Sequence, residues 1–365
     1  MALKLAWTLL LTLTIAAFTT TTAAAPGASA SPTAATPFGP PQPDLGWSEA
    51  VISVSRLPVS VEFLTEVARW RVVARGQTDP ALLRHWGLPA NARAQEALLC
   101  NPGDRSGCVR LIEFRGVPQV QIRSSAQPWE TGGIFSLMTR ARDIDGVFAR
   151  ARRLGYAGFS DPIYFDYKGV RLKNMVLRGP DGVNLAIYQR EVPKLEGWTT
   201  IRGLSSPFNA MQMVRNRETS RAFWSEVMGY TSLSDAEFLD DKPGENNFAL
   251  PANLVTSVSR RHSILGKGVA GLADGAGTRQ VELMQFVGLE GRELGARAVF
   301  PNLGIVALRF PTANLAPYRE RAANHGTADC TVTTARIQGW GRVQVCDLRS
   351  PDGVIAELLQ TSSGK

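Results

Sequence analysis

The stretch Arg178-Gly179-Pro180-Asp181-Gly182-Val183 returns near the end of the chain as Arg349-Ser350-Pro351-Asp352-Gly353-Val354. The two copies lie 171 residues apart (349 − 178), and the same spacing relates residues 132–190 to residues 303–361 without insertion or deletion. A register held over so long a segment indicates a duplicated unit and not a chance of composition. The fold therefore has to be built from repeats.

The preceding segments repeat as well. Aligning Phe63 with Phe223 gives an offset of 160 residues (223 − 63), and the same offset relates Val54 to Val214. Each repeat starts with a strand-like alternation, continues with apolar residues at helical spacing and ends in a short run of strands. We therefore predict an α+β fold made of four βαβββ modules in two tandem domains. The predicted domains are 47–191 and 207–361, joined by a linker at 192–206.

The start of the chain has the layout of a secretory signal peptide. Lys4 precedes an apolar run from Leu5 to Phe18, and small residues follow. This run is short for a membrane span, so we predict a signal peptide at 1–30 and a flexible leader at 31–46. The protein is then exported to the periplasm or secreted, with no stable membrane insertion after cleavage; an uncleaved N-terminal anchor is the alternative.

The cysteines fit an oxidising compartment. Cys100 and Cys108 flank a turn-like segment, and Cys330 and Cys346 flank Gly339-Trp340-Gly341. We predict two local disulfides, Cys100–Cys108 and Cys330–Cys346, one within each domain; four unrelated buried thiols are the alternative.

The formal net charge is +8, but the arginines are scattered along the chain. This distribution argues against a nucleic-acid groove, so no nucleic-acid partner is expected. No phosphate-binding loop, dinucleotide fingerprint or nucleophile elbow occurs either.

At this point the sequence resembles the vicinal-oxygen-chelate superfamily, which includes glyoxalase I, bleomycin-resistance proteins and extradiol dioxygenases. The resemblance rests on Ala222-Phe223-Trp224 with Met228-Gly229-Tyr230, on helices ending at Gly155 and Gly326, and on the repeated Pro-Asp-Gly turns. It implies that paired modules curl into U-shaped sheet cups around a ligand or a metal.

The resemblance also implies metal ligands on the first and last strands of paired modules. By alignment, these positions hold Glu49, Arg110, Ile134 and Ala186 in the first domain. In the second domain they hold Asn209, Glu282, Ile305 and Glu357. Neither set contains the histidine that zinc, nickel or iron sites favour. Dioxygenase activity is therefore not expected, and any divalent metal would depend on Glu282 and Glu357, so the cofactor stays unknown.

We expect Glu282 and Glu357 to point into one cup in the second domain, with Asn209 and Arg309 nearby. Two facing carboxylates repel, which raises the pKa of one and suits it to acid or base catalysis. The alternative is that each glutamate is tied to an arginine or to backbone donors. Met211 and Met284 suit adaptable ligand walls. His85 is expected on a short inserted helix, and His262 on a solvated inserted loop.

The resulting hypothesis is an exported protein that binds a small organic molecule in the second-domain cup. It would act as a lyase or isomerase with Glu282 or Glu357 as the acid or base. The alternatives are a non-catalytic binder of the bleomycin-resistance type and a protein whose cups are filled by its own side chains. The sequence does not indicate an oligomeric state.

Overall fold

The computed structural model describes residues 43–361, apart from residues 105, 168, 197, 199, 200, 249 and 268–278. The predicted signal peptide and most of the predicted leader lie outside the described residues. The last residues of that leader belong to the fold: the Asp44 amide donates to the Pro311 carbonyl at 2.9 Å, and Gly46 forms a β-bridge with Arg279. No helix in the described part of the chain is long and apolar enough to cross a membrane.

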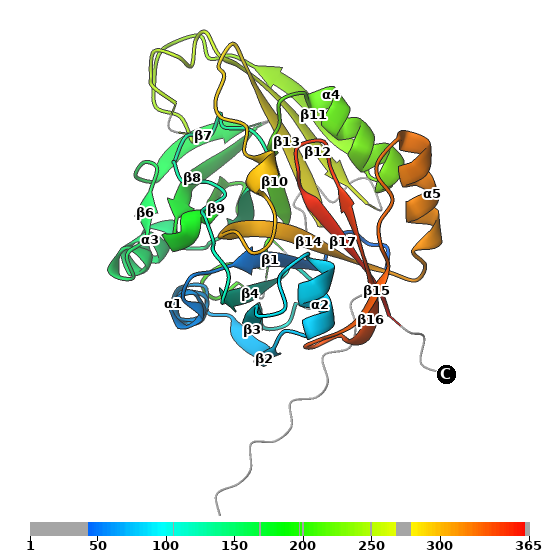
Figure 1. Ribbon diagram of the computed structural model, residues 1–365. Helices are drawn as coiled ribbons and strands as arrows, with labels where there is room; N and C mark the ends of the chain where they lie inside the picture. The colour runs from blue at the N-terminus through cyan, green and yellow to red at the C-terminus, as the bar shows by residue number, and fades with distance from the viewer. Residues whose placement is uncertain are drawn as a thin grey trace, which may run out of the picture. The chain divides into compact units, whose positions relative to one another are not determined.

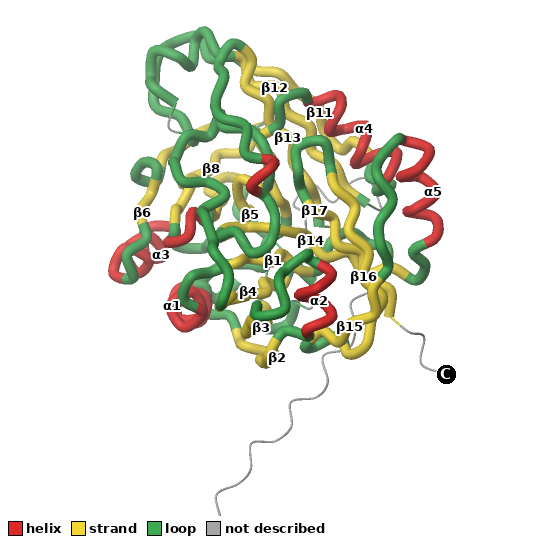
Figure 2. The backbone as a smooth tube through the Cα atoms, viewed as in Figure 1, coloured by secondary structure: helices red, strands yellow, loops and turns green. Residues whose placement is uncertain are grey.

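The strands form two sheets (Figures 1 and 2). The eight-stranded sheet runs in the order β15 (Thr333–Ile337), β16 (Gly341–Arg349), β17 (Ile355–Thr361), β14 (Gly304–Thr312), β1 (Glu49–Ser53), β4 (Cys108–Arg115), β3 (Arg93–Cys100) and β2 (Arg71–Gln77). The nine-stranded sheet runs in the order β11 (Thr231–Phe238), β12 (Ser259–Gly266), β13 (Gln280–Val287), β10 (Asn209–Met213), β5 (Ile134–Arg140), β9 (Asn184–Val192), β8 (Val170–Arg178) and β6 (Ala157–Gly158), with β7 (Ile163–Tyr167) also paired to β8.

Each sheet combines one module from each half of the chain. The first module (β1–β4) pairs with the last (β14–β17) through antiparallel β1 and β14, and the two middle modules pair through antiparallel β5 and β10. We call the eight-stranded sheet the outer cup, after the first and last modules, and the nine-stranded sheet the inner cup. The α+β fold of cups built from two βαβββ modules is confirmed. The cups do not follow the chain order, however, because each predicted domain supplies one module to each cup.

The helices follow the first strand of each module, as the repeat predicts. They are α1 (Leu57–Glu62) continuing as the π-helical turn η1 (Phe63–Val67), α3 (Ile144–Arg153), α4 (Arg217–Ala222) continuing as η3 (Phe223–Val227), and α5 (Ala316–His325). Three short helical segments are α2 (Pro80–His85), η2 (Pro180–Gly182) and η4 (Gly295–Arg297). The α3 helix begins where Asp143 accepts from the Gly146 amide at 2.9 Å, and Gly155 ends the unit with a φ of 81° that favours glycine.

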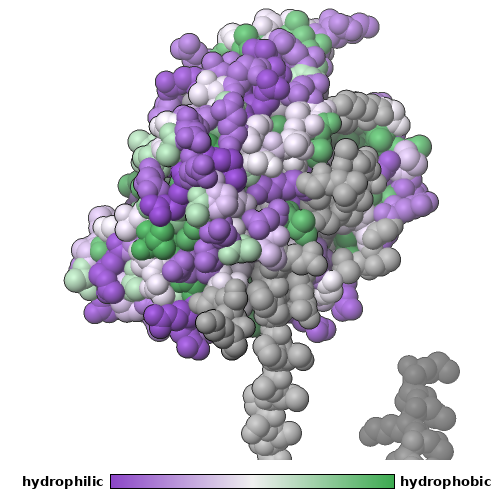
Figure 3. Space-filling view, turned by 90° about the vertical axis from the view of Figure 1, so that its right-hand side faces the viewer, coloured by the Kyte–Doolittle hydropathy of each residue, from purple (hydrophilic) through white to green (hydrophobic). Residues whose placement is uncertain are grey.

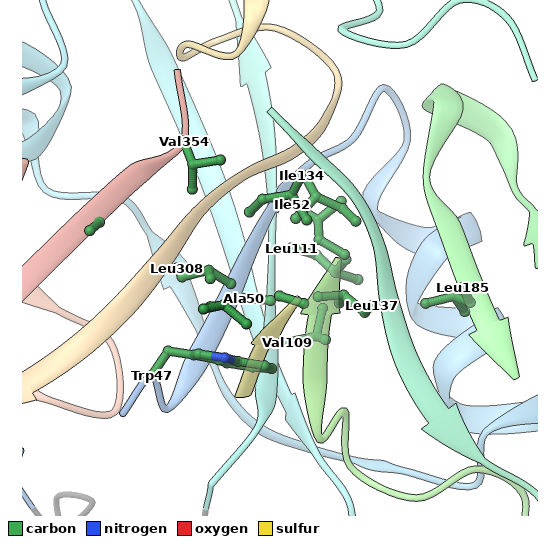
Figure 4. Close-up of a cluster of buried hydrophobic side chains, with 14 of the residues drawn as sticks. Trp47, Ala50, Ile52, Val109, Leu111, Ile134, Leu137, Leu185, Leu308 and Val354 are labelled. Atoms are coloured by element: carbon green, nitrogen blue, oxygen red, sulfur yellow. The ribbon is translucent and has the colours of Figure 1, made fainter. Parts of the chain in front are cut away.

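The main hydrophobic core joins the two sheets. Ile52 on β1 and Leu111 on β4 lie close to Ile134 and Leu137 on β5, as Figure 4 shows. The helices η1 and η3 add Phe63, Phe223 and Trp224 to the same cluster. Burial of this apolar surface leaves the opposite, concave face of each sheet to form its cup.

Both predicted disulfides are confirmed. The Cα atoms of Cys100 and Cys108 lie 4.5 Å apart, and those of Cys330 and Cys346 lie 5.4 Å apart. The first pair joins β3 to β4, and the second ties Cys330, just before β15, to β16. Both pairs therefore brace the outer cup, although they belong to different halves of the chain.

On the face shown in Figure 3, hydrophilic residues cover most of the described surface and hydrophobic ones are scattered. The large exposed hydrophobic residues of the described chain are Leu45, Val120, Tyr164, Val192, Leu233, Leu239, Val287 and Val332. The apolar surface that matters for function therefore has to be sought inside the cups.

Candidate functional site

The outer cup holds a buried cluster of opposite charges. Arg110 Nε lies 2.8 Å from Glu49 Oε2, and Arg110 Nη1 lies 2.8 Å from Glu96 Oε1. Arg309 pairs with Glu357 through its Nε and reaches Glu49 with Nη1 at 3.4 Å. Burial opposes ionisation of Glu49, but the two arginines outweigh it and hold its pKa below the usual value. Each of these glutamates is therefore paired with an arginine from within the chain.

Indole groups complete the closure of the outer cup. Trp86, directly after α2, donates from Nε1 to Glu357 Oε1 at 2.9 Å, and its ring stacks on Phe300 at 3.9 Å. Trp340 donates from Nε1 to Glu49 Oε1 at 2.5 Å. The inserted helix predicted to carry His85 is α2, and it packs against β15. Glu357 is thus tied to an arginine and an indole, as the alternative interpretation of the sequence expected.

The predicted meeting of Glu282 and Glu357 in one cup is wrong. Glu282 lies on β13 of the inner cup, whereas Glu357 lies on β17 of the outer cup. Asn209 accompanies Glu282 on the neighbouring strand, and Arg309 accompanies Glu357. The alignment places both glutamates on equivalent strands of their modules, but the crosswise pairing of modules separates them.

Two β-bulges correct the alignment further. The register between β1 and β14 shifts after Val51, so that Arg309 lies level with Glu49 and Ile305 lies level with Ile52. The inner cup repeats this between β10 and β5, where Met138 lies level with Asn209. Because a bulge reverses the alternation of side chains, Ile305 and Ile134 turn to the main core. Both residues therefore point away from the cups, whereas the sequence alignment had placed them at positions that face the cups.

The inner cup contains a cavity of about 570 Å³. Asn209, Glu282, Met211 and Met284 all line it, so these four predicted residues come together. Its apolar wall is richer in aromatic residues than the sequence indicated, and it includes Phe165, Tyr188, Phe208, Phe238 and Phe248. The cavity has a size typical of small-molecule sites.

Glu282 is the buried one of the acidic residues that line this cavity. Its side chain is 7% exposed, and Asn209 Nδ2 donates to Glu282 Oε2 at 3.0 Å. Burial raises the pKa of Glu282 to about 8, against the smaller lowering effect of that hydrogen bond. Among the described residues, no lysine, arginine or histidine forms an ion pair with it.

Sequence reasoning missed one wall of the cavity. His262 lies on strand β12 and is buried, not on a solvated loop, and Arg260 on the same strand pairs with Asp240 at 2.6 Å. Arg260 also lies over the Phe238 ring at 4.7 Å. The sequence did contain a signal for this wall. Arg260, His262 and Ile264 occupy every second position, which places all three on one face of a strand.

The residues present do not fit a divalent metal. In the outer cup, guanidinium groups fill two of the four positions that face one another on neighbouring strands (Glu49, Arg110, Arg309 and Glu357), and they would repel a dication. In the inner cup, the matching positions hold Asn209, Glu282, Met138 and Ala186, which supply one carboxylate and one amide. The described part of the chain contains no cluster of three His, Cys, Asp or Glu suited to a metal ion.

Comparison with known proteins gives the fold. No family model matches the chain, and no curated protein does. Glyoxalase I from Zea mays is similar in structure, at 14% identity and a TM-score of 0.56 over 86% of this chain and 92% of that one. A putative dioxygenase from Bacillus subtilis is similar at 12% identity and a TM-score of 0.51, over 88% of this chain and 86% of that one. The protein has the vicinal-oxygen-chelate fold.

Within this vicinal-oxygen-chelate fold the two cups have diverged. The outer cup is closed by its own ion pairs and indoles, whereas the inner cup retains a cavity with an unpaired acid. The inner cup is therefore the candidate functional site.

Proposed function

We propose that this protein is exported and binds a small, mostly apolar organic molecule in the inner cup, where Glu282 exchanges a proton with it. The observation that carries the proposal is the buried Glu282, with a pKa raised to about 8, beside a cavity of about 570 Å³. The signal-peptide pattern and the two disulfides support export.

Proton transfer follows from the environment of Glu282. Near neutral pH its carboxyl group holds a proton that it can donate to a ligand oxygen or carbon. The carboxylate left behind keeps the hydrogen bond from Asn209 Nδ2 and can take a proton back. A pKa near the working pH is what efficient general acid–base catalysis requires. This supports a lyase or isomerase that moves a proton next to a carbonyl group.

The second candidate is a non-catalytic binding protein of the bleomycin-resistance type. The methionines favour it, because Met138, Met211 and Met284 give the cavity an adaptable apolar wall that needs no chemistry. The two candidates differ in what Glu282 does after the ligand has bound.

One probe tests both candidates. The ketone 2-acetylnaphthalene has a flat apolar body and methyl protons that exchange with solvent through an enol. We expect it to bind the mature protein, and its methyl protons to exchange faster in D₂O when the protein is present. Binding would be followed by fluorescence and exchange by proton NMR.

Three variants test whether the ligand binds in the inner cup and whether Glu282 exchanges a proton with it. Met284→Trp should block the cavity and abolish binding, whereas Val332→Trp, at an exposed position before β15, should bind normally. Glu282→Gln should bind the ketone but lose the exchange. Binding without exchange in the unaltered protein would favour the non-catalytic binder. Undiminished binding by Met284→Trp would contradict a ligand site in the inner cup.

A further inference from the structure

The two cups differ in how they balance charge at matching positions. In the outer cup, the four matching residues are Glu49, Arg110, Arg309 and Glu357, and each glutamate is paired with an arginine. In the inner cup, Met138 stands at the position of Arg309, and Ala186 stands at the position of Glu357. Glu282 itself stands at the position of Arg110, so among the matching positions of the inner cup a buried acid remains and neither arginine does.

Among the described residues, no arginine, lysine or histidine lies close enough to lower the pKa of Glu282 by its charge. Its neighbours in register are Met211 on β10 and Ile264 on β12, and both are apolar. Arg260, one of the arginines on the cavity wall, is already paired with Asp240.

The cavity is lined by more acidic than basic side chains, although the chain carries a net charge of +8. Its acidic lining residues are Asp166, Glu237, Asp240, Glu245 and Glu282. Its basic lining residues are Arg140, Arg190 and Arg260, and His262 is a further titratable group on β12. An excess of carboxylates in a cleft of a basic protein attracts cations and disfavours anions.

A second acceptor lies beside Glu282. The Oδ1 atom of Asn209 is buried and has no hydrogen-bond partner among the residues that the structure describes, while Nδ2 of the same side chain donates to Glu282. An unsatisfied buried acceptor is costly and calls for a donor. Once Glu282 is ionised, the base of the cavity presents two neighbouring acceptors below a wall of aromatic rings.

We propose that the inner cup binds an organic cation, in which an ammonium group donates hydrogen bonds to Glu282 and Asn209 Oδ1 and a flat apolar body packs against the aromatic wall. This inference rests on the proposed function, because it names the class of ligand for the same cavity. The ammonium group supplies the positive charge that Arg309 supplies in the outer cup. The rings of Phe208, Phe238 and Phe248 suit both the body and the charge of such a ligand.

Binding of an ammonium group must displace a proton. At neutral pH the free protein holds Glu282 mostly protonated, because burial raises its pKa to about 8. An ammonium ligand keeps its own proton and favours the carboxylate, so the carboxyl proton passes to solvent. Binding at pH 7 should therefore release nearly one proton, and affinity should rise with pH until Glu282 is ionised in the free protein.

The test uses three probes of one shape and different charge. They are 2-naphthylmethylamine (a cation at pH 7), 2-naphthylmethanol (neutral) and 2-naphthoate (an anion), titrated calorimetrically into the mature protein. We expect the amine to bind at least about tenfold more tightly than the alcohol, and the naphthoate more weakly than either. Titration of the amine in two buffers with different ionisation enthalpies should reveal the released proton.

Two variants locate the effect. Glu282→Gln should remove both the preference for the amine and the proton release, while the alcohol still binds. Glu320→Gln removes a carboxylate from an exposed position on α5, which does not line the cavity, and should keep both. An equal loss in the two variants would mean that the general field, and not Glu282, selects the cation, and would overturn the inference.

Failure of the organic-cation inference can be distinguished from failure of the proposed function. Equal binding of the amine and the alcohol, or tighter binding of naphthoate, would overturn the organic-cation inference and leave the inner cup as a binding site. If none of the three probes binds, or if Met284→Trp binds them undiminished, the proposed function fails together with the inference.

Discussion

The indole of Trp86 donates to the buried carboxylate of Glu357 across the outer cup, with 2.9 Å between Nε1 and Oε1. The same ring lies flat on Phe300. This side chain therefore occupies the interior of the outer cup. The chain thus fills one of its two cups with its own residues.

Replacing Trp86 with glycine should open the outer cup. We expect the free energy of unfolding to fall by about 2–4 kcal/mol, because a stacked aromatic ring is lost and a cavity remains. Added indole should restore part of the lost thermal stability, since it can stack on Phe300 and donate to Glu357. Thermal unfolding with and without indole is the measurement. Equal stabilisation of the unaltered protein by indole would contradict the prediction.

Arg309→Met should destabilise the protein by about 3–5 kcal/mol, because it leaves Glu357 buried without its cation. Adding Glu357→Ala removes that stranded charge and reproduces the inner-cup residues Met138 and Ala186 at these positions. The double variant should therefore be more stable than Arg309→Met alone. Urea unfolding of the two single variants and the double variant measures this coupling. Simple additivity of the two single effects would show that the ion pair does not act as a unit.

Stability should depend on pH through Glu282. Its pKa is raised in the folded state to about 8, so between about pH 4.5 and pH 8 the folded protein keeps a proton that the unfolded chain releases. The contribution of this group therefore falls as pH rises, by about 1.4 kcal/mol per pH unit at most. Glu282→Gln lacks this dependence. Its unfolding free energy should therefore rise relative to that of the unaltered protein as the pH increases across this range. Parallel pH profiles of the two proteins would refute the raised pKa.

The disulfides should contribute unequally to stability. Cys330 and Cys346 are 16 residues apart, and replacing both with alanine should cost about 3 kcal/mol. Cys100 and Cys108 are only 8 residues apart, so the corresponding double replacement should cost less, because a shorter loop is closed. Thermal unfolding of both double variants without reductant gives the comparison. A larger loss for the Cys100–Cys108 pair would show that loop closure does not govern their effect.

Several parts of the inner-cup site could be read from the sequence. The internal repeat aligned Asn209 with Glu49 and Glu282 with Arg110, and both alignments hold because each pair lies on equivalent strands. Met211 and Met284, which were expected to suit a ligand wall, also line the cavity. The aromatic wall was not recognised, because Phe238 and Phe248 come from an edge strand and a loop outside the repeated segments.

The sequence by itself determined the four modules, the βαβββ order in each, the local cysteine pairs and the identity of the residues at equivalent strand positions. These features depend on hydrophobic periodicity, turn residues and short-range spacing, all of which are local. Only the tertiary structure decided which modules pair. Because the modules are repeats, β1 could pair with β5 or with β14 by the same backbone hydrogen bonds, and long-range packing selects β14. That choice separates Glu357, which its own arginine neutralises, from Glu282, which is left as an unpaired acid beside an open cavity.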